Sequence, residues 1–71
     1  MTRILVKNIL KAVNYELNNG LVYVIIETGR NKYNCYESID IYDCGIGFDD
    51  DYNERITLGF KDINSIKIEE M

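Results

Sequence analysis

Apolar and polar residues alternate with two different periods along this chain, and the change falls at Gly20. Between residues 2 and 18, large apolar residues recur every four positions, which predicts an amphipathic helix. The members of this stripe are Leu5, Ile9, Val13 and Leu17, widened by Leu10 and Ala12. Thr2 can cap the start of the helix, and Asn19-Gly20 supplies a stop where a left-handed residue is needed.

After Gly20 the period changes to two, and short runs rich in β-branched and aromatic residues are separated by turn-forming residues. The predicted strands span residues 21–29, 32–43, 44–48, 55–60 and 65–70. The two glycines of "CGIGF" (44–48) predict a sharp bend or bulge before a short strand. One helix followed by about five antiparallel strands predicts a single α+β domain over residues 1–71. In this domain the N-terminal helix packs on a small, strongly curled antiparallel sheet or barrel.

Composition is typical of a small folded protein. Hydrophobic residues make up 46% and charged residues 28%, which argues against disorder, and no run approaches the about 18 apolar residues of a membrane span. Charges at Arg3, Lys7 and Lys11 interrupt any signal-peptide core, so we expect a cytoplasmic protein with no membrane partner. The abundance of Ile, Asn, Lys and Tyr is typical of AT-rich genomes, which favours a bacterial host cell, its phages or its plasmids.

The charges are distributed unevenly along the chain. The net charge is −4, but residues 1–32 carry +3 and residues 33–71 carry −7. Between Lys32 and Arg55 there are seven acidic residues and no basic one. An acidic segment of this kind attracts basic protein surfaces and repels a phosphate backbone, so a protein partner with a basic surface is expected and nucleic acid is not.

The densest part of the acidic segment is the stretch "GFDDDYNER" (47–55). The D-x-D-x-N spacing from Asp49 to Asn53 matches the opening of a calcium-binding EF-hand loop. Position six of such a loop must be Gly and is Glu54 here, and position twelve must be a bidentate Glu and is Phe60. We therefore predict no metal site. A solvated hairpin tip is the simplest interpretation, because Asp and Asn are turn formers.

No catalytic motif is visible in the sequence. Histidine is absent, which removes the commonest general base and zinc ligand, and Cys35 and Cys44 alone cannot close a tetrahedral zinc site. The chain contains no P-loop, no G-x-S-x-G motif and no H-E-x-x-H motif. We therefore predict a non-enzymatic protein without catalytic residues or cofactor, in which the two cysteines are small core or half-buried residues.

The alternative to a simple hairpin tip is that the acidic run joins other carboxylates in one negative surface. Such a surface attracts basic grooves of nucleic-acid-handling proteins, and neighbouring tyrosines would anchor the contact. The predicted partner-binding residues are Glu37, Asp40, Asp43, Asp49, Asp50, Asp51 and Glu54, with Tyr36, Tyr42 and Tyr52. Carboxylates spaced along a strand imitate phosphates, so the predicted function is an inhibitor that mimics nucleic acid. In size and charge the chain resembles the anti-CRISPR proteins, which would make it an anti-defence protein of a phage or mobile element.

A second resemblance rests on sequence motifs. In "VYVIIETGRNKYNCYESIDIYDC" (22–44), alternating apolar residues precede Gly29, and Asp40 follows that glycine by eleven positions. This order resembles the first motif of the Sm-like RNA-binding proteins, and "ITLGFKDINSIKI" (56–68) is similar to their second motif. The resemblance implies an N-terminal helix on a five-stranded, SH3-like small barrel.

The residues that contact RNA in the Sm-like family are not matched here. Asn34 stands where the family has a second glycine, Cys44 stands where it has an asparagine, and its Arg-Gly pair has no counterpart. The alternative function is therefore an Sm-like oligomer, a dimer or ring, that binds RNA through a basic ridge on the helix. Arg3, Lys7 and Lys11 stand four apart and form this ridge, whose simplest interpretation is a solvated helix face.

Overall fold

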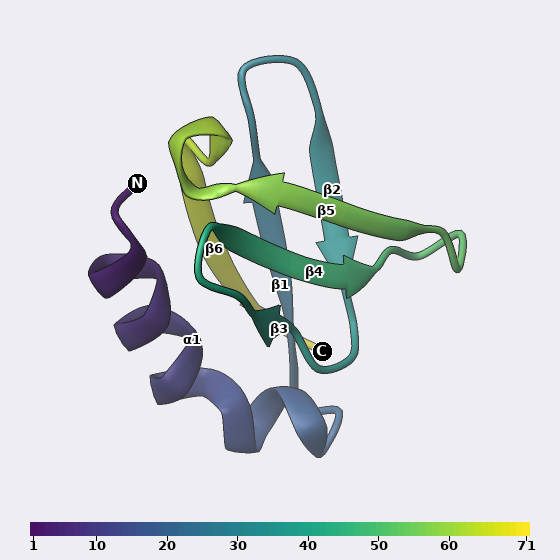
Figure 1. Cartoon of the computed structure of the whole chain (residues 1–71). Coiled ribbons are helices and arrows are strands. Elements are labelled where there is room, and N and C mark those ends of the chain that lie inside the picture. Colours follow the sequence, from purple (N-terminus) through teal and green to yellow (C-terminus); the bar gives the residue numbers. More distant parts are fainter.

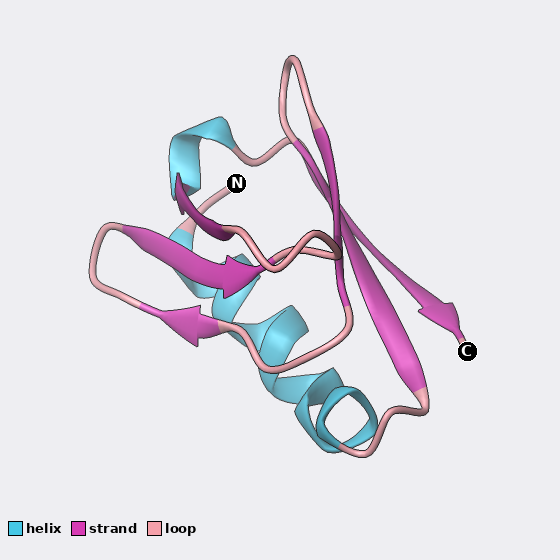
Figure 2. Cartoon of the chain, turned by 90° about the vertical axis from the view of Figure 1, so that its right-hand side faces the viewer, coloured by secondary structure: helices cyan, strands magenta, loops and turns pink.

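One helix and six strands form an α+β fold in the computed structural model, which describes residues 1–71 (Figure 1). The elements are α1 (Arg3–Asn18), β1 (Val22–Glu27), β2 (Lys32–Cys35), β3 (Asp40–Ile41), β4 (Gly45–Asp49), β5 (Arg55–Gly59), the 3-10 turn η1 (Phe60–Asp62) and β6 (Ser65–Glu70). The strands form two antiparallel sheets with the orders β2-β1-β6 and β3-β4-β5. Figure 2 shows the sheets as two layers, with α1 along one side. The α+β class is confirmed. The predicted barrel of about five strands is wrong, because six strands form two sheets that are neither closed nor strongly curled.

Helix α1 has the predicted bounds to within one residue. The hydroxyl oxygen of Thr2 accepts a hydrogen bond from the Leu5 N–H (3.2 Å), and Gly20 follows the helix with a positive φ of 69°. The predicted apolar stripe is only partly correct, since Leu5 is exposed while Val6 is buried. Residues four apart advance by about 40° more than a full turn, so a strict four-residue stripe rotates away from the core. Helix α1 is neither long enough nor apolar enough to cross a membrane.

The predicted strand over residues 32–43 is divided into two short strands that belong to different sheets. Strand β2 pairs with β1 and ends at Cys35, which is fully buried. The chain then crosses to the other layer and pairs again as β3, next to β4. The crossing residues between them are mostly exposed. A two-layer fold requires the chain to change sheets. The mixed polarity of residues 32–43 is explained by this crossing, because its residues face solvent.

The two glycines of β4 serve close packing within a regular strand. The predicted sharp bend lies directly before this strand, at Asp43 and Cys44, where the Tyr42 N–H donates to the Gly45 carbonyl. Both Gly45 and Gly47 are buried and paired with β5. A Cβ atom on Gly47 would lie 2.8 Å from both the Arg55 Nη2 and the Tyr42 Cε2 atoms. The glycines therefore leave room for the neighbouring backbone and side chains.

The core lies between the two sheets and α1. It contains no buried polar or charged residue, and the Phe48 ring meets the Tyr33 ring edge-on, with centroids 5.9 Å apart. The buried cluster comprises Val6, Leu10, Leu17, Val22, Val24, Ile26, Cys35, Ile46, Phe48, Phe60 and Ile63. The amino group of Met1 donates to the carbonyl oxygens of Phe60 and Ile63, both at 2.9 Å, and so ties the first residue to η1.

Candidate functional site

The acidic run forms the turn between β4 and β5, and Asp50 organises this turn. Its carboxylate oxygen accepts hydrogen bonds from the N–H groups of Tyr52 and Glu54, both at 2.9 Å. Its backbone carbonyl accepts from Asn53, which has a positive φ of 62°. Asp50 is therefore the turn former of a hairpin tip, as the simplest interpretation of the run requires.

Arg55 neutralises part of the acidic surface. Its Nη2 atom lies 2.7 Å from the Asp40 carboxylate and 2.7 Å from the Tyr42 hydroxyl oxygen, and its Nη1 atom lies 3.6 Å from Asp49. The hydrogen bonds to Asp40 and then to Tyr42 raise the pKa of Arg55 above its ordinary value. Asp40, Asp49 and Tyr42 thus have an internal partner. We did not single out Arg55 from the sequence, although it is the first base after the acidic segment.

Four acidic residues surround a hollow of about 210 Å³ at the side of the β4–β5 turn. We call this the acidic hollow; it is lined by Tyr36, Glu37, Asp49, Asp50, Asp51 and Asn53. The lining residues come from the β2–β3 crossing, the end of β4 and the turn. The structure therefore brings together five of the predicted partner-binding residues, which come from two separate segments of the sequence.

Tyr36 connects the acidic hollow to the outer face of the β2-β1-β6 sheet. Its ring stacks on Tyr23 with centroids 5.1 Å apart and an interplanar angle of 26°. The thiol of Cys35 donates to the Glu37 carbonyl oxygen (3.0 Å), which fixes the backbone at the hollow. Burial raises the pKa of the Cys35 thiol, and both cysteines are free, with Cys44 exposed. Tyr23 was not predicted as a site residue, because its alternation with buried valines indicated only a strand.

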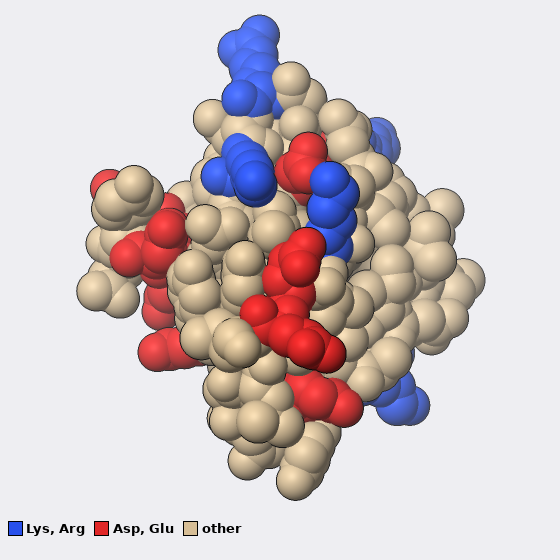
Figure 3. Space-filling model, turned by 180° about the vertical axis from the view of Figure 1, so that it is seen from behind, with Lys and Arg blue, Asp and Glu red and all other residues tan.

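The remaining predicted residues do not join the acidic hollow. Asp43 lies 3.7 Å from the guanidinium of Arg3, on the side of the helix, and Tyr42 is engaged by Arg55. Glu54 and Tyr52 are exposed at the turn, with Tyr52 80% exposed. Figure 3 shows the face behind the view of Figure 1, where acidic side chains form one band down the middle and a separate group at the left margin. On this face the acidic side chains therefore form two groups rather than one continuous surface.

The aspartates of the turn are not arranged as metal ligands. No group of three or more Asp, Glu, Cys or His side chains stands in a geometry that could hold a metal ion. Asp50 directs its carboxylate to backbone N–H groups, and Asp49 faces Arg55.

The basic ridge of α1 lies on the flank of the helix that faces β3. Lys7 and Lys11 border a hollow of about 260 Å³ together with Leu10, Asn14, Ile39 and Ile41. Arg3, the third member of the ridge, contacts Asp43. The ridge is thus partly compensated within the chain, and its two lysines remain exposed.

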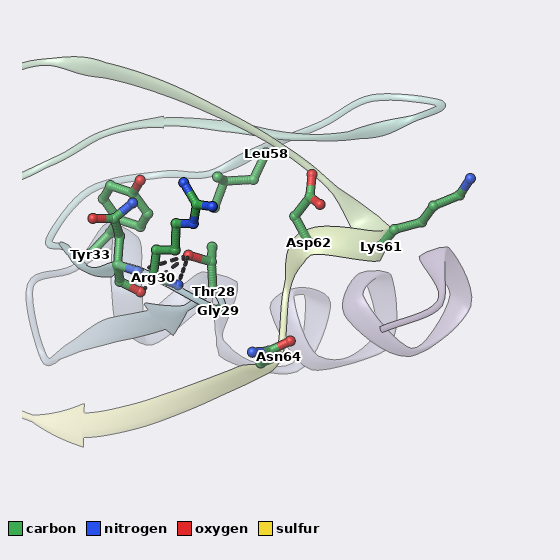
Figure 4. Close-up of a pocket in the computed structure, with 9 residues that line it drawn as sticks. Thr28, Gly29, Arg30, Tyr33, Leu58, Lys61, Asp62 and Asn64 are labelled. Atoms are coloured by element: carbon green, nitrogen blue, oxygen red, sulfur yellow. Dashed lines mark hydrogen bonds between the residues drawn. The ribbon is translucent and has the colours of Figure 1, made fainter.

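The largest hollow, about 450 Å³, lies between the β1–β2 turn and η1 (Figure 4). The Thr28 hydroxyl accepts hydrogen bonds from the N–H groups of Arg30 (3.3 Å) and Asn31 (3.0 Å) and so shapes one wall. In Figure 4 the Lys61 side chain points away from the other lining residues. Asp62 is the one carboxylate of this lining, and no sequence motif indicates a site here.

No protein family, curated protein or solved structure matches this chain. The resemblances to Sm-like proteins and to anti-CRISPR proteins stay predictions. The function is accordingly inferred from the side chains and their contacts alone.

Proposed function

We propose that this chain is a non-enzymatic interaction protein whose acidic hollow binds a basic segment of another protein. The observation that carries the proposal is the convergence of Glu37 from the β2–β3 crossing with Asp49 and Asp51 from the β4–β5 hairpin around one hollow. Carboxylates that gather in this way, beside an aromatic ring, suit the guanidinium of an arginine. The ring of Tyr36 would add a cation–π contact of about 0.5–1 kcal/mol at an exposed site.

The energetics favour an arginine-rich or lysine-rich partner over a single bound cation. An exposed ion pair contributes only about 0–1 kcal/mol, because water screens both charges. Useful affinity therefore needs several basic side chains that meet Glu37, Asp51 and the exposed Glu54 together. Long-range attraction between the acidic half and such a partner would raise the association rate, and salt would lower it.

A groove that normally binds nucleic acid is the partner surface proposed in finer detail. Its lysines and arginines are spaced to meet phosphates, and the carboxylates of the acidic hollow would take their place. The chain would then be a phage-encoded or mobile-element inhibitor, of the anti-defence kind that includes anti-CRISPR proteins.

The proposal is tested with a tetra-arginine peptide titrated into the labelled protein and followed by NMR. We expect the largest chemical-shift changes at the backbone amides of Tyr36, Glu37 and Asp51. The binding should be saturable, and its affinity should fall as salt is added. Asp49 and Asp50 are unsuitable for charge reversal, because Arg55 and the turn depend on them. The test variant is therefore E37K/D51K, whose side chains make no hydrogen bond or ion pair in the structure.

A matched control changes the net charge by the same amount away from the hollow. The variant D62K/E70K serves this purpose, since neither side chain lines the acidic hollow. We expect E37K/D51K to weaken peptide binding about fivefold or more, which corresponds to about 1 kcal/mol for two lost pairs, and D62K/E70K to remain within about twofold. Equal weakening in both variants would show that only net charge matters and would reject the hollow as the site. A host protein captured from a lysate by the wild type and by D62K/E70K, but not by E37K/D51K, would identify the partner.

The alternative function, RNA binding by an oligomer through Arg3, Lys7 and Lys11, is tested on the same preparation. Excess absorbance at 260 nm in the protein peak at low salt, lost in the variant K7E/K11E, would support it. A peak free of nucleic acid would reject it.

A further inference from the structure

Strand β6 is an open edge of the β2-β1-β6 sheet, and its pairing with β1 defines which backbone groups are free. The Met71 N–H donates to the Leu21 carbonyl (3.1 Å). In an antiparallel pair, hydrogen-bonded residues alternate with non-bonded ones, so Glu69 and Lys67 also bond to β1. The N–H and C=O groups of Ile66, Ile68 and Glu70 therefore point away from β1, toward the open edge.

Two features that keep sheet edges apart, a short strand and a proline, are missing from this edge, although Lys67, Glu69 and Glu70 are charged. Strand β6 has six residues and no proline, whereas the opposite edge strand, β2, has four. Helix α1 packs mainly against β1 within this sheet. Ile68 lies opposite the buried Val24 and faces the core side, yet it is 44% exposed. The C-terminal half of β6 thus presents a free edge beside an incompletely covered isoleucine.

We propose that β6 pairs antiparallel with β6 of a second copy of this chain, about a two-fold axis at Ile68. Ile68 then faces its own symmetry mate, and Ile66 faces Glu70 of the other copy. These are the residues whose backbone groups are free, so each of these pairs exchanges two hydrogen bonds. The result is one six-stranded sheet across the dimer.

Charge complementarity selects this register and this partner. On the outer face of the sheet, Lys67 of each copy stands opposite Glu69 of the other, which gives two symmetric ion pairs. Moving the two-fold axis by one residue, to Lys67 or to Glu69, would place that residue opposite its own symmetry mate. Like charges directly opposite each other destabilise a strand pair. The sequence "IKIE" (66–69) is thus complementary to itself in antiparallel orientation. The acidic hollow borders β2, at the opposite edge of the sheet, and stays free in the dimer.

The test is sedimentation equilibrium of the full chain at low salt, with circular dichroism to check that each variant is folded. We expect a concentration-dependent dimer for the wild type and a dissociation constant raised about tenfold or more by E69K, which makes both cross-copy pairs repulsive. K67E breaks the 3.1 Å ion pair with Glu27, so E69K is the cleaner single variant. The charge swap is therefore made as E27K/K67E/E69K, which keeps that pair with reversed charges and restores opposite charges between the copies, and it is expected to recover dimerisation. A wild type that stays monomeric, a ring larger than a dimer, or a charge swap that fails to recover the dimer would each overturn the proposal.

Cross-linking tests the two-fold axis directly. In a C44S background, which removes the exposed native thiol, I68C places two cysteines opposite each other at a separation that a disulfide spans. K67C is the matched control, because Lys67 faces Glu69 and not itself. Rapid oxidation of I68C to a covalent dimer, with K67C unreacted, is the expected result, and equal cross-linking of both would reject the register.

Discussion

Replacing Gly45 by alanine tests the packing of β4 against β5 more sharply than any core truncation. A Cβ atom at residue 45 would lie far inside contact distance of the Leu58 carbonyl oxygen, 2.9 Å from the Leu58 carbonyl carbon and 3.0 Å from the Gly59 Cα. These are backbone atoms of the paired strand, so no side-chain rotation relieves the clash. Strand β5 must move by about an ångström for the alanine to fit.

The energetic cost follows from the hydrogen bonds that such a movement disturbs. The Phe60 N–H donates to the Cys44 carbonyl (3.3 Å), and the ladder between β4 and β5 continues at the pair Ile46 and Leu58. Two or three lost bonds at about 1 kcal/mol each, with steric strain added, lower the free energy of unfolding by about 3 kcal/mol or more. A single core of this size contributes only about 3–5 kcal/mol of net stability, so we expect G45A to be largely unfolded at 25 °C.

The matched control is the same substitution at Gly29. A Cβ atom there meets nothing within 4 Å, and its φ is not positive. G29A should therefore be neutral or stabilise by about 0.4–1 kcal/mol, because alanine restricts the unfolded chain. Urea and thermal unfolding followed by circular dichroism measure both variants. A G45A protein that unfolds within about 5 °C of the wild type would refute the close strand packing at β4.

Two further predictions concern the turn and the thiols. D50A should lower the free energy of unfolding by about 1–2 kcal/mol, because two N–H groups lose their carboxylate acceptor, while D51A should stay within about 0.5 kcal/mol; urea unfolding compares them. At pH 8 a thiol reagent should modify Cys44 rapidly and Cys35 only on unfolding, as counted by absorbance, and fast modification of both would contradict the burial. Burial raises the pKa of the Cys35 thiol in the folded protein, so the thiol stabilises the folded state fully below about pH 8.5, the ordinary pKa of cysteine. The free energy of unfolding should therefore fall as the pH rises above this value, and C35A should lack this pH dependence.

Local chemistry made the helix and most strands predictable. Thr2 and Gly20 mark the ends of α1 through a capping hydrogen bond and a left-handed residue, both of which depend on neighbours in sequence. The alternation of Val22, Val24 and Ile26 likewise identifies the buried face of β1. The exposed position of Leu5 shows the limit of this reasoning, because the helix orientation is set by what it packs against.

Most residues of the candidate site were predictable from the sequence, but their arrangement in space was not. Charge density singled out Glu37 and the aspartates of the turn, but it could not separate Asp51, which is free, from Asp49, which faces Arg55. That contact joins two residues that the pairing of β4 with β5 places opposite each other beside the turn. The stack of Tyr36 on Tyr23 joins the β2–β3 crossing to β1, so no local sequence pattern predicts it.

The sequence by itself determined the fold class, the bounds of the helix and the strong acidity of the segment between Lys32 and Arg55, because each depends on residue type and near neighbours. Only the tertiary structure decided that residues 32–43 cross between two sheets, that the glycines of β4 serve close backbone contact, and that β6 is left as an open edge. The physical reason is that strand pairing and burial are settled between residues distant in the chain. The alternation of apolar and polar residues predicts which face of a strand each side chain occupies. The strand with which it pairs depends on the whole fold.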